Sequence, residues 1–403
     1  MYLTREEEAI INGELGEQYS KALKVVVKVG EALGAEKLIK VSHAHISGIS
    51  YYNIGDYGLN LMEDLAGSNV VFSTYTTANP YASVFTDFAS AFFDYGVRNK
   101  QLRIIKALAK MGARAFTCVP YYVRRPVIDE HLAWAESNAV LYANSVIGAR
   151  TNKEGGPLAL MAAIVGRTYY WGMHRDDERR PDVLVNVITP LSIEEASTLG
   201  YLAGKVSANT IPYIRGLGKG LSEDMLRAFL SSFAVASSVP MVFIEGVTPG
   251  YKGAAGFVGT GSTRYSVSRE ELMNFIKKVR GDGRSEPTLY VIGCPHLSHE
   301  EVISIVNRFL TRCCRRGEEA KELWILTYKG LELGKDVVRR LAKLGVKVLF
   351  NVCPIVTKLK VIGVSRVVTD SVKALYYIPK VSGVKAYLMD REDILREFLG
   401  LVT

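Results

Sequence analysis

The sequence predicts an α/β protein with several packed domains and mainly parallel sheets. The chain has 403 residues, more than one hydrophobic core usually organises, so several domains are expected. It contains short apolar runs without polar alternation, which are typical of strands buried on both faces of parallel sheets. These runs alternate with stretches that begin with helix-start signals, the order of elements that indicates an α/β fold.

The helix starts are marked by capping boxes, in which a Ser or Thr and a Glu three residues later satisfy the first backbone amides. They are Thr4/Glu7, Ser192/Glu195, Ser268/Glu271 and Ser298/Glu301. The predicted strands are Lys37–Val41, Asn69–Phe72, Arg114–Thr117, Val183–Ile188, Met241–Ile244, Leu289–Ile292, Leu323–Leu326 and Val346–Val352. We expect three α/β regions, residues 1–150, 151–285 and 286–403, with approximate boundaries and segments that can be discontinuous.

The chain is basic, with 50 Lys and Arg against 41 Asp and Glu. Such an excess suits nucleic acid, an anionic substrate or an acidic partner subunit. The basic residues are scattered, so we expect no nucleic-acid partner. The first eleven residues carry four charges, unlike a secretory signal. The sequence also contains no run of about 18 apolar residues, the length that a membrane-spanning helix needs. We therefore expect a soluble cytoplasmic protein that does not bind membranes.

Three of the five cysteines share one local setting. Cys118, Cys294 and Cys353 each come at or near the end of a predicted strand, with a proline one or two residues later. The carboxyl ends of strands are where open α/β sheets place ligands, and the proline holds the thiol on a fixed loop. Cys-Pro is also a recurring context for iron–sulfur cluster ligands.

Three such thiolates without a fourth suggest a four-iron cluster with one open iron, which acts as a Lewis acid on a substrate oxygen. Electron-transfer clusters more usually have four cysteines with close spacings such as C-x-x-C. Three buried structural cysteines fit the spacing equally well, and a structural zinc site would need a fourth thiolate. Cys313 and Cys314 fall in a predicted amphipathic helix, where a structural role is favoured.

Polar residues cluster after several predicted strands. His43 and His45 follow the first one, where they would bind metal, orient a carboxylate or serve the structure. The small residues at 47–50 expose backbone amides that suit an anion. Asn79 and Asn138 are also explained as turn or cap residues. Arg150 and Asn152 lie in a glycine-bounded loop that could clamp a carboxylate or phosphate.

Long segments of the chain, taken in order, resemble the aconitase X family. They are YLTREEEAIINGELG, SHAHISGISYYNIGDYGL, TTANP, AESNAVLYANSVIGARTNKEGGP, IGCPHLS and NVCP. The resemblance covers nearly the whole chain and implies a fold like the first three domains of aconitase. A separate small subunit would supply the fourth, mobile domain and with it the catalytic base.

Within the family the chain is most similar to the archaeal members of the mevalonate pathway of isoprenoid biosynthesis. The resemblance implies dehydration of (R)-5-phosphomevalonate to trans-anhydromevalonate 5-phosphate, with a [4Fe-4S] cluster on Cys118, Cys294 and Cys353. The implied substrate contacts are Gly48, Ile49, Ser50, Asn79, Pro80, Ser137, Asn138 and Lys373. Residues expected to support these groups are His43, His45, Arg150 and Asn152. The alternatives are another hydroxy acid, such as cis-3-hydroxy-L-proline, and a non-catalytic scaffold subunit.

Overall fold

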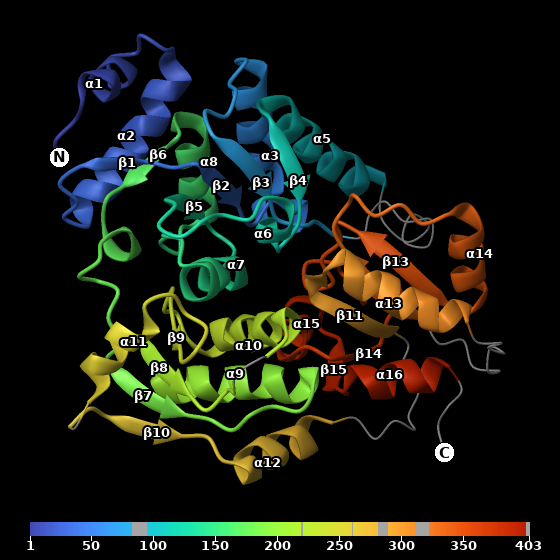
Figure 1. Ribbon diagram of the computed structural model, residues 1–403. Coiled ribbons are helices and arrows are strands. Elements are labelled where there is room, and N and C mark those ends of the chain that lie inside the picture. The colour runs from blue at the N-terminus through green and yellow to red at the C-terminus, as the bar shows by residue number, and fades with distance from the viewer. Residues whose placement is uncertain (83–94, 219–220, 260, 281–288, 312–321, 400–403) are drawn as a thin grey trace.

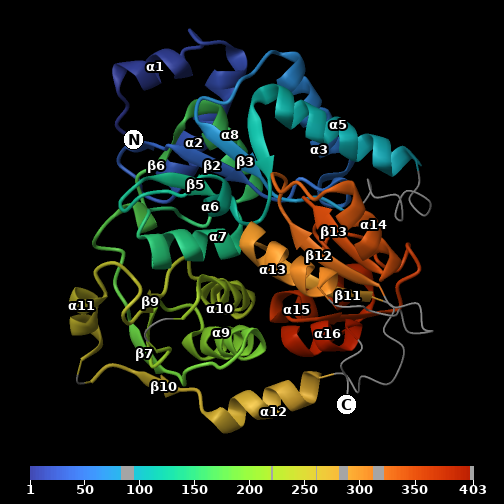
Figure 2. The same cartoon turned by 45° about the vertical axis from the view of Figure 1, so that its right-hand side comes forward.

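The computed structural model describes residues 1–82, 95–218, 221–259, 261–280, 289–311 and 322–399. These residues form three sheet-containing regions that meet near the middle of the molecule (Figures 1 and 2). The predicted amphipathic helix is present as α13 (His299–Leu310), whereas Cys313 and Cys314 themselves lie outside the described residues. None of the helices in the described segments is long and apolar enough to cross a membrane.

The first region contains a parallel sheet in the order β4-β3-β2-β5. Its strands are β2 (His43–Ile46), β3 (Tyr75–Ala78), β4 (Ala113–Phe116) and β5 (Leu132–Trp134), with an antiparallel pair β1 (Leu38–Lys40) and β6 (Arg167–Tyr169) beside them. Its helices are α1 (Arg5–Ile11), α2 (Glu17–Ala32), α3 (Tyr51–Gly67), α5 (Tyr95–Met111), α6 (Pro120–Val123), α7 (Ser137–Tyr142), the π-turn η1 (Ala143–Ile147) and α8 (Gly156–Val165). Apolar residues of α2, α3, α5 and α8 share one core with β2.

The second region contains a parallel sheet in the order β10-β7-β8-β9. Its strands are β7 (Val183–Asn186), β8 (Pro212–Arg215), β9 (Phe243–Ile244) and β10 (Arg264–Ser266). Its helices are η2 (Gly172–His174), α9 (Ile193–Ser207), α10 (Glu223–Ala236), α11 (Tyr251–Ala254), η3 (Ala255–Val258) and α12 (Arg269–Val279). Helices α9 and α10 pack side by side and turn toward the centre of the molecule (Figure 1).

The third region contains a parallel sheet in the order β13-β12-β11-β14-β15. Its strands are β11 (Leu289–Leu297), β12 (Leu323–Thr327), β13 (Val346–Phe350), β14 (Arg366–Thr369) and β15 (Lys385–Leu388). Its helices are α13 (His299–Leu310), α14 (Lys335–Lys343), α15 (Val372–Ser382) and α16 (Arg391–Phe398). Alternate residues of β11 enter two different cores, which explains why its sequence is apolar without alternation.

The predicted helix starts are confirmed. Thr4, Ser268 and Ser298 form complete capping boxes, whereas Ser192 caps α9 without the reciprocal bond. The predicted strand Asn69–Phe72 is wrong, and the strand of this part of the chain is β3. Asn69 has a left-handed φ of 58°, which ends α3 and turns the chain. Phe72 is apolar because it packs in the core as part of a loop.

The mainly parallel character of the sheets is confirmed, because every pairing in the three larger sheets is parallel. The boundaries that the sequence suggests at residues 150 and 285 stay a prediction. Strand β6 pairs with β1, so residues 167–169 lie with the first region.

Candidate functional site

The carboxyl edges of the first and third sheets face each other. Cys118 follows β4, and Cys353 follows β13 in the opposite sheet. The loops after β3 and β13 are joined directly, since the Tyr81 amide donates to the Asn351 carbonyl (3.1 Å) and the Cys353 amide donates to the Tyr81 carbonyl (2.8 Å). This junction brings segments that are far apart in the sequence into one site.

Glycine is required where β11 enters this site. Gly293 has a φ of +106°, and a Cβ at this position would lie 2.4 Å from the backbone oxygen of Leu326 in β12. The register of β11 with β12 shifts just beyond, between Ile292 and Leu297. Cys294 therefore lies at an irregular point of the strand, followed by a cis bond to Pro295.

The three thiols Cys118, Cys294 and Cys353 are partly exposed and share the same charged neighbours. Burial raises the pKa of Cys118 well above its usual value, raises that of Cys294 to about 12 and also raises that of Cys353. The charge of Glu136 raises, and that of Lys373 lowers, all three of these pKa values. Cys294 also interacts electrostatically with both other thiols. The three thiols are therefore all subject to the charges of the same two residues, Glu136 and Lys373.

His296 connects the loops that carry these thiols. Its backbone amide donates to the Cys118 sulfur at 3.3 Å. Its Nε2 lies 2.8 Å from the Val352 carbonyl, and its Nδ1 lies 3.1 Å from the Thr117 hydroxyl. Burial lowers the pKa of His296 to about 4, so the ring is neutral and Nε2 carries the proton that it donates to the carbonyl. His296 was not among the residues predicted from the sequence, although it stands two residues after Cys294.

Glu136 is the centre of the polar network. Its carboxylate accepts hydrogen bonds from Lys373 Nζ at 2.5 Å and from the amides of Asn79 and Asn138, each at 2.8 Å. Burial alone would raise the pKa of Glu136, but Lys373 and the amides outweigh it and bring the pKa to about 2. Glu136 is therefore an ionised carboxylate fixed by three donors. Glu136 lies in one of the segments that resemble the family, but it was not among the predicted site residues.

The predicted histidines support this network from inside β2. His45 Nε2 lies 2.8 Å from Asn79 Oδ1, and its Nδ1 lies 2.7 Å from the Thr77 hydroxyl. His43 Nε2 contacts the same hydroxyl at 2.9 Å. Both rings are fully buried within the strand, not at its end as the sequence suggested. Burial lowers the pKa of His45 to about 4, so its ring is neutral and orients Asn79.

The predicted substrate contacts of the first region lie around the same edge of the sheet. Gly48, Ile49 and Ser50 form the turn between β2 and α3, and Pro80 follows Asn79. The Ser50 hydroxyl and Asn138 Oδ1 are buried and have no hydrogen-bond partner among the described residues. Such orphaned atoms call for an explanation, and a ligand would supply the missing partners. Ser137 begins α7, with its hydroxyl 3.5 Å from Lys373 Nζ.

Arg150 and Asn152 have other contacts. The Arg150 guanidinium donates to Asp129 and Asp176, and the Asn152 side chain holds the backbone at Trp171 and Met173. In the part of the chain that the structure describes, neither side chain contacts a site cysteine, Glu136 or Lys373. Both side chains therefore tie the loop that contains η2 to the first region.

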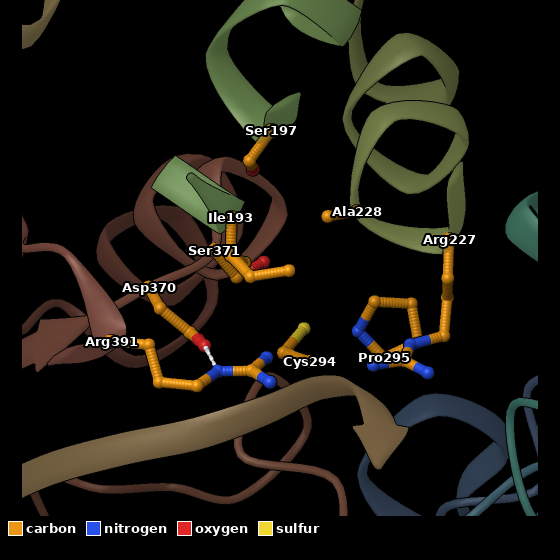
Figure 3. A pocket seen from close by; sticks show the side chains of 9 residues that line it. All are labelled: Ile193, Ser197, Arg227, Ala228, Cys294, Pro295, Asp370, Ser371 and Arg391. Carbon is orange, nitrogen blue, oxygen red and sulfur yellow. Dashed lines mark hydrogen bonds and ion pairs between the residues drawn. The ribbon is translucent and has the colours of Figure 1, made fainter. Parts of the chain in front are cut away.

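A small cavity lies behind Cys294 (Figure 3). Its volume of about 10 Å³ is close to the room that one water molecule needs. It is lined by Ile193, Ser197, Arg227, Ala228, Cys294, Pro295, Asp370, Ser371 and Arg391. A hydrogen bond from the Ser371 hydroxyl lowers the pKa of Cys294, while burial raises it more strongly.

In the described residues, no three His, Cys, Asp or Glu side chains lie close enough together to hold a single metal ion. This finding is compatible with a larger group, because in an iron–sulfur cluster each cysteine binds a different iron atom and the thiolates stand further apart. The donor set fits such a cluster: three partly exposed thiols from two sheets, with shared charged neighbours.

Three parallel sheets with cysteines at two facing edges define an α/β protein of the aconitase-like fold class. Residues 1–177, 181–277 and 287–400 match the models of the first, second and third domains of aconitase X. The chain belongs to the aconitase X family. A solved structure, the holo form of Thermococcus kodakaraensis aconitase X, is 31% identical and matches with a TM-score of 0.84 over 98% of this chain and 100% of that chain.

Curated relatives extend over the same length. A Methanocaldococcus jannaschii protein named phosphomevalonate dehydratase large subunit is 35% identical over 98% of this chain and 100% of its own length. Four further archaeal proteins carry the same name. A Pseudomonas aeruginosa protein named cis-3-hydroxy-L-proline dehydratase is 31% identical over 94% of this chain, which covers 66% of that relative.

Proposed function

We propose that this chain is the large subunit of a hydro-lyase that dehydrates (R)-5-phosphomevalonate to trans-anhydromevalonate 5-phosphate. The observation that carries the proposal is the convergence of Cys118, Cys294 and Cys353 on the ionised Glu136–Lys373 pair. Full-length similarity to five archaeal proteins named as this subunit supports the substrate. The relatives named for cis-3-hydroxy-L-proline are more distant, so the alternative substrate is not favoured.

The three cysteines would hold a [4Fe-4S] cluster. When bound, the cluster supplies an open iron that acts as a Lewis acid toward the hydroxyl and carboxylate of the substrate. The Ser50 hydroxyl and Asn138 Oδ1, which have no hydrogen-bond partner among the described residues, offer the substrate buried polar atoms. The Lys373 ammonium and the amides of the turn at Gly48 favour an anionic group beside the thiols.

Dehydration also needs a base that removes the proton next to the carboxylate. Glu136 is unsuited to this task, because its pKa of about 2 makes it a weak base near neutral pH and three donors occupy its oxygens. We therefore place the base on a small-subunit partner, as the resemblance to aconitase implies. The role of Glu136 is to orient Lys373 and the two asparagines.

The test is anaerobic co-expression of this chain with the small subunit, followed by assay with phosphomevalonate and with cis-3-hydroxy-L-proline. We expect a brown complex that contains iron and dehydrates phosphomevalonate at the higher kcat/KM. A colourless complex after anaerobic reconstitution with iron and sulfide would contradict the cluster. Preference for the proline derivative would contradict the substrate, and no turnover of either would favour the scaffold alternative.

A further inference from the structure

The segment from Asn152 to Gly156 passes along the edge of the predicted site. A Cβ at Gly156 would lie 2.4 Å from the Ser47 carbonyl, so the start of α8 lies against the turn that contains Gly48 and Ser50. Lys153 forms a parallel bridge with Trp134, and the Glu154 amide donates to the Trp134 carbonyl at 3.1 Å. The segment is therefore a neighbour of both the Gly48 turn and the chain leading to Glu136.

The direction of the Lys153 side chain follows from its neighbours. Asn152 binds the backbone at Trp171 and Met173, and Glu154 accepts hydrogen bonds from Thr168 and Tyr169. Since side chains alternate along an extended segment, Lys153 points the opposite way. Its bridge partner Trp134 lies with its ring 5.2 Å from that of His43. Bridge partners share a face, so Lys153 extends on the side of the histidines and the Glu136 network.

Lys153 is a second cation near the Glu136 network, in addition to Lys373. Its side chain is exposed, and no carboxylate pairs with its ammonium among the described residues. Desolvation lowers the pKa of Lys153, the charge of Lys373 lowers it further, and Glu136 raises it. Lys373 differs, because its charge is already compensated by Glu136 at 2.5 Å. An anion that enters the site would thus meet in Lys153 a cation whose charge no carboxylate of the described residues compensates.

We propose that Lys153 binds the phosphate group of the substrate, an assignment that rests on the proposed dehydratase function. The substrate has a carboxylate near the reacting atoms and a phosphate at the other end of its carbon chain. Lys373 pairs with Glu136 beside the thiols, whereas Lys153 lies on the neighbouring segment that leads into α8. Lys153 is therefore placed to bind the phosphate, the substrate group far from the reacting atoms. The start of α8, which has no side-chain cap, adds backbone amides and the positive end of a helix dipole.

The test compares substrate with and without phosphate in the cluster-loaded complex of both subunits. Lys153→Met keeps most of the side-chain length and removes the charge. We expect KM for phosphomevalonate to rise about ten- to a hundredfold, the loss typical of a charge-assisted hydrogen bond, with kcat changed by less than about threefold. The inhibition constant of mevalonate, which lacks the phosphate, should change by less than about threefold.

Two matched variants complete the design. Lys153→Arg should restore most of the affinity for phosphomevalonate, and Lys205→Met, which removes an exposed lysine of α9, should behave like the unmodified complex. Visible absorption checks that each variant keeps its cluster. An unchanged KM in Lys153→Met overturns the inference, as does a parallel loss of mevalonate binding, which would place Lys153 on the carboxylate. If the unmodified complex does not dehydrate phosphomevalonate, the proposed function fails first and this inference with it.

Discussion

At the scale of single residues, the site depends on contacts between distant parts of the chain. Lys373 and Glu136 stand 237 positions apart and form one buried ion pair. The sequence marked Lys373, Ser137 and Asn138 through their motifs. It gave no signal that Glu136 would be the shared acceptor, because a carboxylate before a helix more often serves as a cap or faces solvent.

Replacing Glu136 tests the importance of this acceptor. Glu136→Gln leaves the Lys373 ammonium without its counter-ion in a buried setting, so we expect a loss of about 3–5 kcal/mol in the free energy of unfolding. Urea unfolding under anaerobic conditions measures it. The matched control is Glu63→Gln, which breaks the more exposed pair with Arg103 and should cost at most about 1 kcal/mol. Equal losses in the two variants would show that the buried pair has no special role.

The thiols give a second test at this scale. Cys294→Ser should lower the iron content and visible absorption of the anaerobically reconstituted complex and abolish nearly all of its dehydratase activity, because serine is a poor cluster ligand. Iron analysis, absorption spectra and turnover measure these effects. Cys313→Ser is the control, since the sequence favours a structural role for that cysteine. Full activity in Cys294→Ser would support the scaffold alternative.

At the scale of elements, short strands were the hardest to predict. Capping boxes located the starts of α1, α12 and α13, since the signal lies within four neighbouring residues. Strand β5 has only three residues, and β2 contains two histidines that looked like loop residues. Their strand character comes from pairing within a buried sheet, which propensity does not capture.

The contact between β6 and Glu154, in the loop before α8, should make the stability of the protein depend on pH. Burial raises the pKa of Glu154 to about 7. Hydrogen bonds from Tyr169 and Thr168 lower this pKa, but burial has the larger effect. A raised pKa means that the folded protein prefers the protonated carboxyl group. The contribution to stability is therefore fully present below the unfolded pKa near 4.5 and is lost as the pH rises through about 7.

Glu154→Gln should remove this dependence. At pH 8 the variant should be more stable than the unmodified chain, by up to about 3 kcal/mol from a shift of this size. At pH 4 the two should differ little. Urea unfolding at both pH values measures the difference. Parallel pH profiles of the two proteins would contradict the predicted titration of Glu154.

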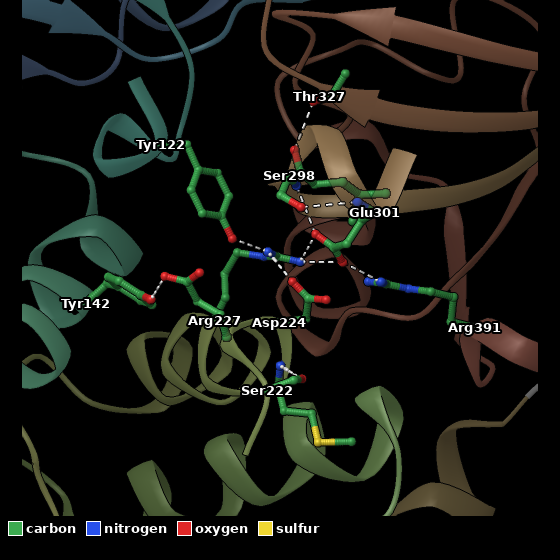
Figure 4. Close-up of polar contacts among 12 residues, drawn as sticks. Tyr122, Tyr142, Ser222, Asp224, Arg227, Ser298, Glu301, Thr327 and Arg391 are labelled. Atoms are coloured by element: carbon green, nitrogen blue, oxygen red, sulfur yellow. Dashed lines mark hydrogen bonds and ion pairs between the residues drawn. The ribbon is translucent and has the colours of Figure 1, made fainter. Parts of the chain in front are cut away.

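At the scale of the whole molecule, one arginine joins all three regions (Figure 4). Arg227 of α10 donates to the Tyr122 hydroxyl in α6 at 2.5 Å and to Glu301 in α13 at 2.7 Å. Arg391 of α16 donates to the same Glu301 at 2.6 Å and to Asp370 at 2.6 Å. Arg227, Asp370 and Arg391 line the cavity behind Cys294, so the network also fixes the thiol relative to the second region.

Arg227→Met should therefore destabilise the assembly of the three regions. We expect a loss of about 3–5 kcal/mol, the usual cost of removing one partner of a buried ion pair. The double variant Arg227→Met with Glu301→Gln should lose less than the sum of the two single changes, because they remove the same interaction. Urea unfolding of all four proteins gives the coupling. Additive losses would show that the two charges do not depend on each other.

The sequence alone determined the α/β class, the parallel sheets, several helix starts and the resemblance to aconitase X. These properties depend on local signals: apolar runs, caps and motifs of a few residues. Only the tertiary structure decided which polar groups meet, with Glu136 and His296 at the centre and Arg150 turned to other partners. The physical reason is that strand pairing and the junction of two sheet edges bring together residues whose separation in the sequence carries no information about their contact.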